Sequence, residues 1–365
     1  MKIILKHFFR TDLDLLQAGA GNSFRLARSN PDTGGRHSAH HLHGSRAGIL
    51  HRLATCGPGL AASLGLILAL TLSAPATVRA AETGKTFSTP EEAVAALAAA
   101  ANTKDQDALQ GIFGPAVAEI RNPDRVQAAN NLQTFAAVLN ATNQLVHESD
   151  TRCVLEVGTN AWPFPIPIVK QDGKWFFDTK AGEEEILNRR IGQNELETLQ
   201  TVRAYVDAQR EYASRDRDGG QVLKYAQRLF SSPGTKDGLY WPPDLDGEIS
   251  PLGPLVANAR SEGYGIKSKD TNPGPEPYHG YYFKILTLQG KHASGGKYNY
   301  VINGNMIGGF ALVAWPAEYG NSGIMTFIVN QQGRVYQKDL GSKTGKLAPA
   351  MKQYDPDSTW QLSSD

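Results

Sequence analysis

An uncharged, mostly apolar run at residues 59–72 constrains this chain more than any other feature, because it lies more than fifty residues after the first methionine. A basic residue, Arg52, precedes the run, and Ala80 and Ala81 supply small residues after it. With fourteen residues, the run is shorter than the roughly 20 apolar residues of a bilayer-spanning helix. The pattern predicts a secretory signal that is cleaved after Ala80 or Ala81, with an uncleaved amphipathic anchor and a buried core helix as the alternatives.

The predicted leader, residues 1–81, carries much of the unusual composition. Six of the nine histidines precede residue 52, but a metal site that is lost on export cannot serve the exported product. Residues 1–80 hold nine Lys and Arg against three Asp, so 28 basic and 33 acidic residues remain. Because a nucleic-acid-binding protein needs a basic surface, we predict no nucleic-acid partner. Cys56 is lost with the leader, which leaves Cys153 without a disulfide partner.

Residues 82–192 form the first of two predicted modules. Thr89-Pro90 and Asn122-Pro123-Asp124 are typical of helix starts, because an oxygen-bearing side chain can cap free amide groups there. Strands are then predicted at residues 153–157, 164–169 and 175–178. Through Gly173-Lys174-Trp175, a turn glycine followed by tryptophan, this module resembles exported domains of the nuclear-transport-factor-2-like superfold, which hosts many functions.

Residues 193–365 form the second predicted module. Helical spacing predicts a long helix at residues 194–215 and a shorter one at 222–229. Apolar segments from residue 281 onward predict an antiparallel meander, whose sheet we expect the long helix to cover. The predicted fold class is therefore α+β, with N-terminal helices and a small sheet, then a long helix packed on an antiparallel β-meander.

The second module combines the helix at residues 201–212 with Gly280-Tyr281-Tyr282-Phe283 and a strand that ends in Trp315-Pro316. In this combination it resembles the globular head of type IV pilin-like proteins. Pilins need an apolar N-terminal helix that directly follows a prepilin cleavage site, whereas residues 193–212 are charged and follow another module. The resemblance therefore implies a pilin-head-like fold without filament assembly.

Three segments, Tyr281-Tyr282-Phe283, residues 314–320 and residues 335–341, carry a further resemblance. Through them, residues 87–360 resemble a bacterial family of exported proteins catalogued as domain of unknown function 2950. The resemblance implies export, and it implies no activity.

Several fragments imitate catalytic or metal-binding motifs without their essential parts. Residues 341–346 have the wrong glycine spacing for a phosphate-binding loop. Ser294-Gly295-Gly296-Lys297 imitates the serine motif of penicillin-binding enzymes, in which a helix orients the nucleophilic serine. The two glycines disfavour such a helix here. Asp244-Leu245-Asp246 offers carboxylates for calcium, but the apolar residues 251–256 supply no further ligands. We therefore predict no catalytic, cofactor-binding or metal-binding residue.

An aromatic group is the one candidate for a binding surface. His279 lies between Tyr278 and Tyr281, and these residues together with Trp241 could stack on a sugar or a peptide. Packing in the core or at its rim is the alternative for all four. Convergence of Trp241, Asp244 and His279 on one pocket would favour a ligand site or an enzyme.

These patterns predict an exported protein in the periplasm or secreted from the cell, with no transmembrane segment after processing. Its role is expected to be non-enzymatic, as a binding or scaffolding protein for an envelope component that is either protein or glycan. The alternative is a hydrolase or lyase acting on cell-envelope material, with a site assembled only by the fold.

Overall fold

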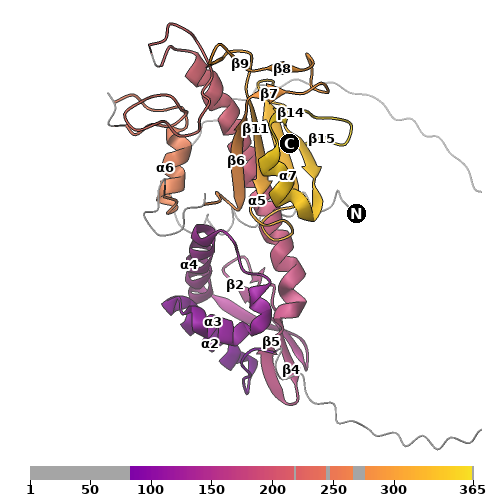
Figure 1. Cartoon of the computed structure of the whole chain (residues 1–365). Helices are drawn as coiled ribbons and strands as arrows, with labels where there is room; N and C mark the ends of the chain where they lie inside the picture. Colours follow the sequence, from indigo (N-terminus) through magenta and orange to yellow (C-terminus); the bar gives the residue numbers. More distant parts are fainter. Residues whose placement is uncertain (1–82, 218, 244–246, 266–275, 364–365) are drawn as a thin grey trace, which may run out of the picture. The chain divides into compact units, whose positions relative to one another are not determined.

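The computed structural model describes residues 83–363 except for residue 218 and the segments 244–246 and 266–275 (Figure 1). The predicted leader with Ala80 and Ala81, and the acidic turn that begins at Asp244, lie outside the described residues. The helices are α2 (Pro90–Thr103), α3 (Gln106–Phe113), α4 (Arg125–Ala141), α5 (Thr179–Ala213), α6 (Gly253–Ser261) and α7 (Thr344–Ala350). The strands are β1 (Asn143–Ser149), β2 (Arg152–Val157), β3 (Trp162–Pro163), β4 (Ile168–Gln171), β5 (Lys174–Phe177), β6 (Tyr281–Leu286), β7 (Leu288–Gln289), β8 (Tyr298–Asn299), β9 (Val301–Ile302), β10 (Asn305–Met306), β11 (Ala311–Pro316), β12 (Met325–Asn330), β13 (Tyr336–Asp339), β14 (Gln353–Tyr354) and β15 (Gln361–Leu362).

Side-chain caps set the starts of the first helices. Before α2, the hydroxyl of Thr89 accepts a hydrogen bond from the backbone N–H of Glu92 at 3.2 Å. The Glu92 carboxylate in turn accepts one from the N–H of Ser88 at 2.8 Å, so two otherwise free amide groups are satisfied reciprocally. Asp124 caps α4 by accepting a hydrogen bond from the N–H of Gln127. Both predicted helix starts are confirmed.

The N-terminal helices pack on an antiparallel sheet with the strand order β1-β2-β4-β5, to which β3 is added beside β2. Alternate residues of β2, among them Cys153 and Leu155, are buried, and they join Leu97 of α2 in one hydrophobic cluster. The strand predicted at residues 164–169 begins only at Ile168. This strand, β4, lies between β2 and β5 in the sheet.

A 35-residue helix, α5, carries the C-terminal sheet, whose strand order is β15-β13-β12-β11-β6 with every neighbour antiparallel. In Figure 1, α5 lies behind this sheet and α7 lies in front of it, and both helices contact β11. The Tyr205 hydroxyl of α5 donates a hydrogen bond to the carbonyl of Ala311 at 3.1 Å. The predicted α+β class, with a long helix against an antiparallel meander, is confirmed.

The helices of the second predicted module differ from the sequence prediction in two places. α5 begins at Thr179, after the Asp178 cap, and so runs through the predicted boundary at residues 192 and 193. The division into two modules stays a prediction. The helix predicted at residues 222–229 is absent from the described residues, which are irregular there. The buried amide of Gln209 bonds both the N–H and the C=O of Ala226, which replaces the hydrogen bonds of a helix.

Candidate functional site

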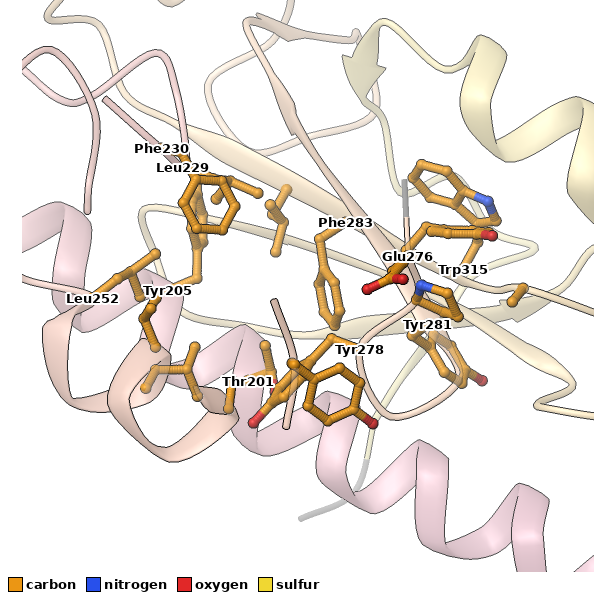
Figure 2. Close-up of a pocket in the computed structure, with 18 of the residues that line it drawn as sticks. Thr201, Tyr205, Leu229, Phe230, Leu252, Glu276, Tyr278, Tyr281, Phe283 and Trp315 are labelled. Carbon is orange, nitrogen blue, oxygen red and sulfur yellow. The ribbon is translucent and has the colours of Figure 1, made fainter. Parts of the chain in front are cut away.

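A cleft of about 880 Å³ opens beside β6 (Figure 2). Its walls come from α5, α6, α7, β6 and β11, from the chain before β6 and from residues 229–230. The aromatic side chains that line it are Tyr205, Phe230, Tyr264, Tyr278, Tyr281, Tyr282, Phe283 and Trp315. Apolar clefts of a few hundred to about 1,000 Å³ with few polar groups are typical of ligand sites.

The cleft follows the edge of β6. Tyr281, Tyr282 and Phe283 are consecutive in one strand, so their side chains point alternately to opposite faces of the sheet. All three nevertheless line the cleft. Tyr282 lies beside Trp315 of β11, its register partner, with ring centroids 5.9 Å apart. A cavity that contacts both faces of a strand must pass around the edge of that strand, and β6 is the last strand in the order of its sheet.

Besides the tyrosines, three polar side chains line the cleft: Thr201, Arg260 and Glu276. Arg260 is exposed, and its guanidinium lies 5.5 Å from the ring centroid of Tyr240. In the view of Figure 2, the Glu276 carboxylate lies between Phe283 and Trp315, and Leu252 lies on the other side of Phe283. The cleft therefore combines broad aromatic surface with one cationic and one anionic group.

A tight turn forms the wall of the cleft before β6. Tyr278 and Tyr281 exchange backbone hydrogen bonds of 2.9 and 3.1 Å across the two intervening residues. Those residues, His279 and Gly280, have φ angles of 47° and 73°, so both lie in the left-handed region, as in a type I′ turn. A non-glycine residue in this region is strained, and surrounding contacts must hold it in place.

Two hydrogen bonds hold the turn from behind. The N–H of Gly280 donates to the Asp124 carboxylate at 3.0 Å, and the N–H of His279 donates to the Tyr264 hydroxyl at 3.3 Å. That hydroxyl itself donates to Asp124 at 2.7 Å. Burial and the nearby Asp124 carboxylate raise the pKa of Tyr264, so the hydroxyl keeps its proton. Asp124, the N-terminal cap of α4, thus positions two aromatic side chains that line the cleft, Tyr264 and Tyr278.

Of the four residues predicted from sequence as a possible binding surface, the structure places two in the wall of the cleft and two outside it. Tyr278 and Tyr281 line the cleft, whereas His279 and Trp241 do not. The His279 ring lies 4.3 Å from that of Tyr278, and its Nε2 lies 3.0 Å from a carboxylate oxygen of Glu262. Its Nδ1 is buried without a hydrogen-bond partner among the described residues. Ligand binding by these residues stays a prediction.

Trp241 lies in the hydrophobic core. Its side chain is buried, and its indole N–H donates to the carbonyl of Glu248 at 3.1 Å. The cations of Arg217 and Lys236 lie 5.5 and 5.4 Å from its ring. Such contacts stabilise a loop around an indole. Asp244, whose convergence with Trp241 and His279 on one pocket would favour a ligand site, lies outside the described residues.

Two other chemical groups lie outside the walls of the cleft. Glu195 of α5 accepts hydrogen bonds from the N–H groups of Ile324 and Met325, and burial raises its pKa. Cys153 lies 3.2 Å from Nδ1 of His147, but burial raises the pKa of this thiol, which disfavours the nucleophilic thiolate. The described residues contain no cluster of three or more His, Cys, Asp or Glu that could hold a metal ion.

Sequence reasoning did not find Phe230, Arg260, Glu276, Phe283 and Trp315, which also line the cleft. Phe283 and Trp315 stand in segments that carry the family resemblance, and this was the only signal available for them. No sequence motif marks Arg260 or Glu276. They could not be predicted, because only the tertiary fold brings them to the edge of β6.

The sequence pattern of the family described as protein of unknown function (DUF2950) matches residues 84–362. No curated protein and no solved structure is detectably similar to the chain. The resemblances to pilin heads and to the nuclear-transport-factor-2-like superfold therefore stay predictions, as does a bacterial origin.

Proposed function

Since the chain belongs to the DUF2950 family, whose description gives no function, we propose from the geometry that it is an exported binding protein. The proposed site is the cleft beside β6, and the proposed ligand presents apolar or aromatic groups. One observation carries the proposal: aromatic side chains from separate elements, among them Tyr205 of α5, Phe283 of β6 and Trp315 of β11, converge on one partly open cavity.

The lining chemistry favours binding. Aromatic rings bury large apolar areas and lose little conformational freedom, while a few polar groups orient the ligand. Arg260 and Glu276 can take that orienting role. The proposed partner is an envelope component, either a protein or a glycan.

The proposed location is the periplasm or the outside of the cell. The apolar run at residues 59–72 and the acidic balance of the remaining chain support it. Among the described residues, no helix is long and apolar enough to cross a membrane. Mass spectrometry of the native product tests this part. We expect an N-terminus at Ala81 or Glu82, and peptides from residues 1–50 in the purified product would contradict it.

The binding part is tested with N-phenyl-1-naphthylamine, a neutral dye that fluoresces in apolar sites. We expect the full chain to bind the dye, and Phe283→Ala to weaken binding by about tenfold, as expected when a central aromatic side chain is lost. The matched control is Phe135→Ala, which truncates a half-buried phenylalanine of the N-terminal part that is not in the cleft. No dye binding, or equal loss in both variants, would refute the proposed cleft.

A hydrolase or lyase acting on envelope material is the second candidate, and the 3.0 Å contact between His279 and Glu262 favours it. A carboxylate beside an imidazole is the usual partner of a general base. Hydrolysis of envelope glycan or peptide by the purified chain, lost in His279→Gln but retained in His292→Gln, would establish this candidate. His292 provides a comparable contact with Asp355, at 3.1 Å, away from the cleft.

A further inference from the structure

The outer edge of β6 is occupied at both ends by backbone hydrogen bonds. At its start, the N–H and C=O of Tyr281 both pair with Tyr278 of the tight turn. Just after its end, the carbonyl of Thr287 accepts a hydrogen bond from the N–H of Tyr300 at 2.9 Å. Tyr281 and Thr287 therefore direct their backbone groups away from β11.

The inner edge of β6 fixes the alternation between these two points. The carbonyl of Gly280 accepts a hydrogen bond from the N–H of Ala317, on the side of β11. In an antiparallel pair, consecutive residues direct their backbone groups to opposite sides of the strand. The backbone N–H and C=O groups of Tyr282 and Lys284 therefore point toward β11, where the register partners of these residues are Trp315 and Val313.

The same alternation leaves two residues of β6 whose backbone groups point away from β11: Phe283, which lines the cleft, and Ile285, which follows on the same edge beyond the lining residues. Phe283 and Ile285 direct their N–H and C=O groups outward, between the positions that Tyr278 and Tyr300 occupy. Among the described residues, no backbone or side-chain hydrogen bond reaches these four groups. Unpaired backbone groups at a strand edge are a template for another strand.

We propose that the cleft binds an extended peptide segment of a partner protein, which adds to the sheet as a strand beside β6. This inference rests on the proposed binding function and names its ligand class. The occupant must supply donors and acceptors to Phe283 and Ile285, which are about 7 Å apart along the strand. An extended peptide has this repeat, whereas an acyl chain would cover the edge of β6 and leave its four polar groups without partners, which is costly.

The two faces of the cleft suit the alternating side chains of such a peptide. On the face of Phe283, the cleft wall includes Thr201 of α5 and Leu252 just before α6. On the face of Tyr282, the wall includes Trp315 and Pro349. A strand that is added to an edge places alternate side chains on each face, so backbone pairing gives affinity and the two pockets give specificity. Figure 2 shows Leu252 and Trp315 on either side of Phe283.

The inference is tested with peptides selected against the full chain from a displayed library of random seven-residue sequences. A selected peptide is synthesised with capped ends and in two further forms, N-methylated at its even or at its odd positions. N-methylation removes the backbone donor and leaves the side chain unchanged. Strand addition exposes only one of the two sets to β6, so we expect one form to bind at least tenfold more weakly and the other to bind nearly as well as the parent.

Amide hydrogen exchange in the complex supplies a second measurement with an internal control. We expect the N–H groups of Phe283 and Ile285 to exchange at least tenfold more slowly when the peptide is bound. The N–H groups of Tyr282 and Lys284 face β11 and should change little. Neither measurement requires a variant that might fail to fold.

Different outcomes separate this inference from the function on which it rests. If the naphthylamine dye binds and Phe283→Ala weakens it, but no peptide is selected or both methylated forms bind like the parent, strand addition is refuted and the apolar site remains. If neither the dye nor a peptide binds, both proposals fail. A dimer of the chain that the selected peptide dissociates would assign the edge to a second copy and refute a foreign partner.

Discussion

The carboxylate of Asp124 accepts a hydrogen bond from the hydroxyl of Tyr264 at 2.7 Å, although 140 positions separate the two residues along the chain. Asp124 is only 1% exposed, and it also accepts hydrogen bonds from the N–H groups of Gln127 and Gly280. The residue that starts α4 therefore also fixes the turn and the aromatic wall beside β6. Stability of α4 and geometry of the cleft should be coupled through this one carboxylate.

Tyr264→Phe tests the coupling. The change removes the hydroxyl that donates to Asp124 and accepts from the N–H of His279. We expect the free energy of unfolding in urea to fall by about 1–3 kcal/mol, as for a buried hydrogen bond to a charged group. The control Tyr319→Phe removes a hydroxyl from an exposed 3.3 Å contact with Asp339 and should cost less than about 0.5 kcal/mol.

A double-mutant cycle with Asp124→Ala measures the pair itself. The two changes share a partner, so their effects on the free energy of unfolding should be non-additive by about 0.5–3 kcal/mol. Strictly additive losses would show that Tyr264 and Asp124 do not stabilise each other.

Gly280→Ala tests the turn. Gly280 has a φ of 73°, and an added Cβ would overlap the side-chain amide of Asn194 and approach Cβ of Ser322 to 3.0 Å. Gly296 is a matched control, because its φ is 74° and an added Cβ would meet nothing within 4 Å. Gly296→Ala should therefore report the left-handed backbone alone, about 1–2 kcal/mol. Gly280→Ala should cost a further ~1–3 kcal/mol from overpacking. Equal losses in urea unfolding would contradict the close packing of the turn on α5.

Glu195→Gln tests a pH dependence. Burial raises the pKa of the Glu195 carboxyl in the folded chain above its ordinary value of 4.5. Between 4.5 and the raised value, the folded state binds more protons than the unfolded state, so this residue makes stability fall as pH rises. Its contribution is most favourable below pH 4.5 and is lost as pH rises through the folded pKa. We expect Glu195→Gln to reduce this downward slope in urea midpoints measured from pH 4 to 8.

The control for that slope is Glu184→Gln, on an exposed position of the same helix. The glutamine at position 195 can still accept hydrogen bonds from the N–H groups of Ile324 and Met325, so the fold should persist. Parallel pH curves for Glu195→Gln and the unchanged chain would rule out Glu195 as the source of the slope.

Local signals in the sequence predicted local structure well. Thr89 and Asp124 cap helices where their patterns indicated, and the central strands after residue 281 were predicted because their apolar runs are continuous. The start of α5 was missed because charged residues and two glycines, Gly182 and Gly192, interrupt the apolar pattern after Asp178. The helix expected at residues 222–229 was wrong because a distant side chain, Gln209, satisfies the backbone of Ala226.

The cleft could be predicted only in part, because long-range packing creates it. Tyr278 and Tyr281 were found through their aromatic neighbours in sequence, and the same criterion selected Trp241, which lies in the core. An aromatic pattern does not distinguish a buried indole from a cleft wall, since both need apolar surroundings. Arg260 and Glu276 reach the cleft through tertiary contacts alone.

Reactivity of Cys153 gives a last prediction, on the N-terminal sheet. The thiol is buried in β2, and burial together with the carboxylates of Glu91 and Glu148 raises its pKa. A thiol reagent reacts with the thiolate, so a buried thiol with a raised pKa should react only when the sheet opens. In a Cys56→Ser background, we expect labelling by a disulfide reagent at pH 8 to be at least a hundredfold slower in the folded chain than in the urea-unfolded chain.

The control variant is Ser149→Cys, combined with Cys56→Ser and Cys153→Ala. It places a thiol on the exposed end of β1 and should label at nearly the unfolded rate. Fast labelling of Cys153 in the folded chain would show that β1 and β2 separate readily, and that the contact with His147 does not protect the sulfur.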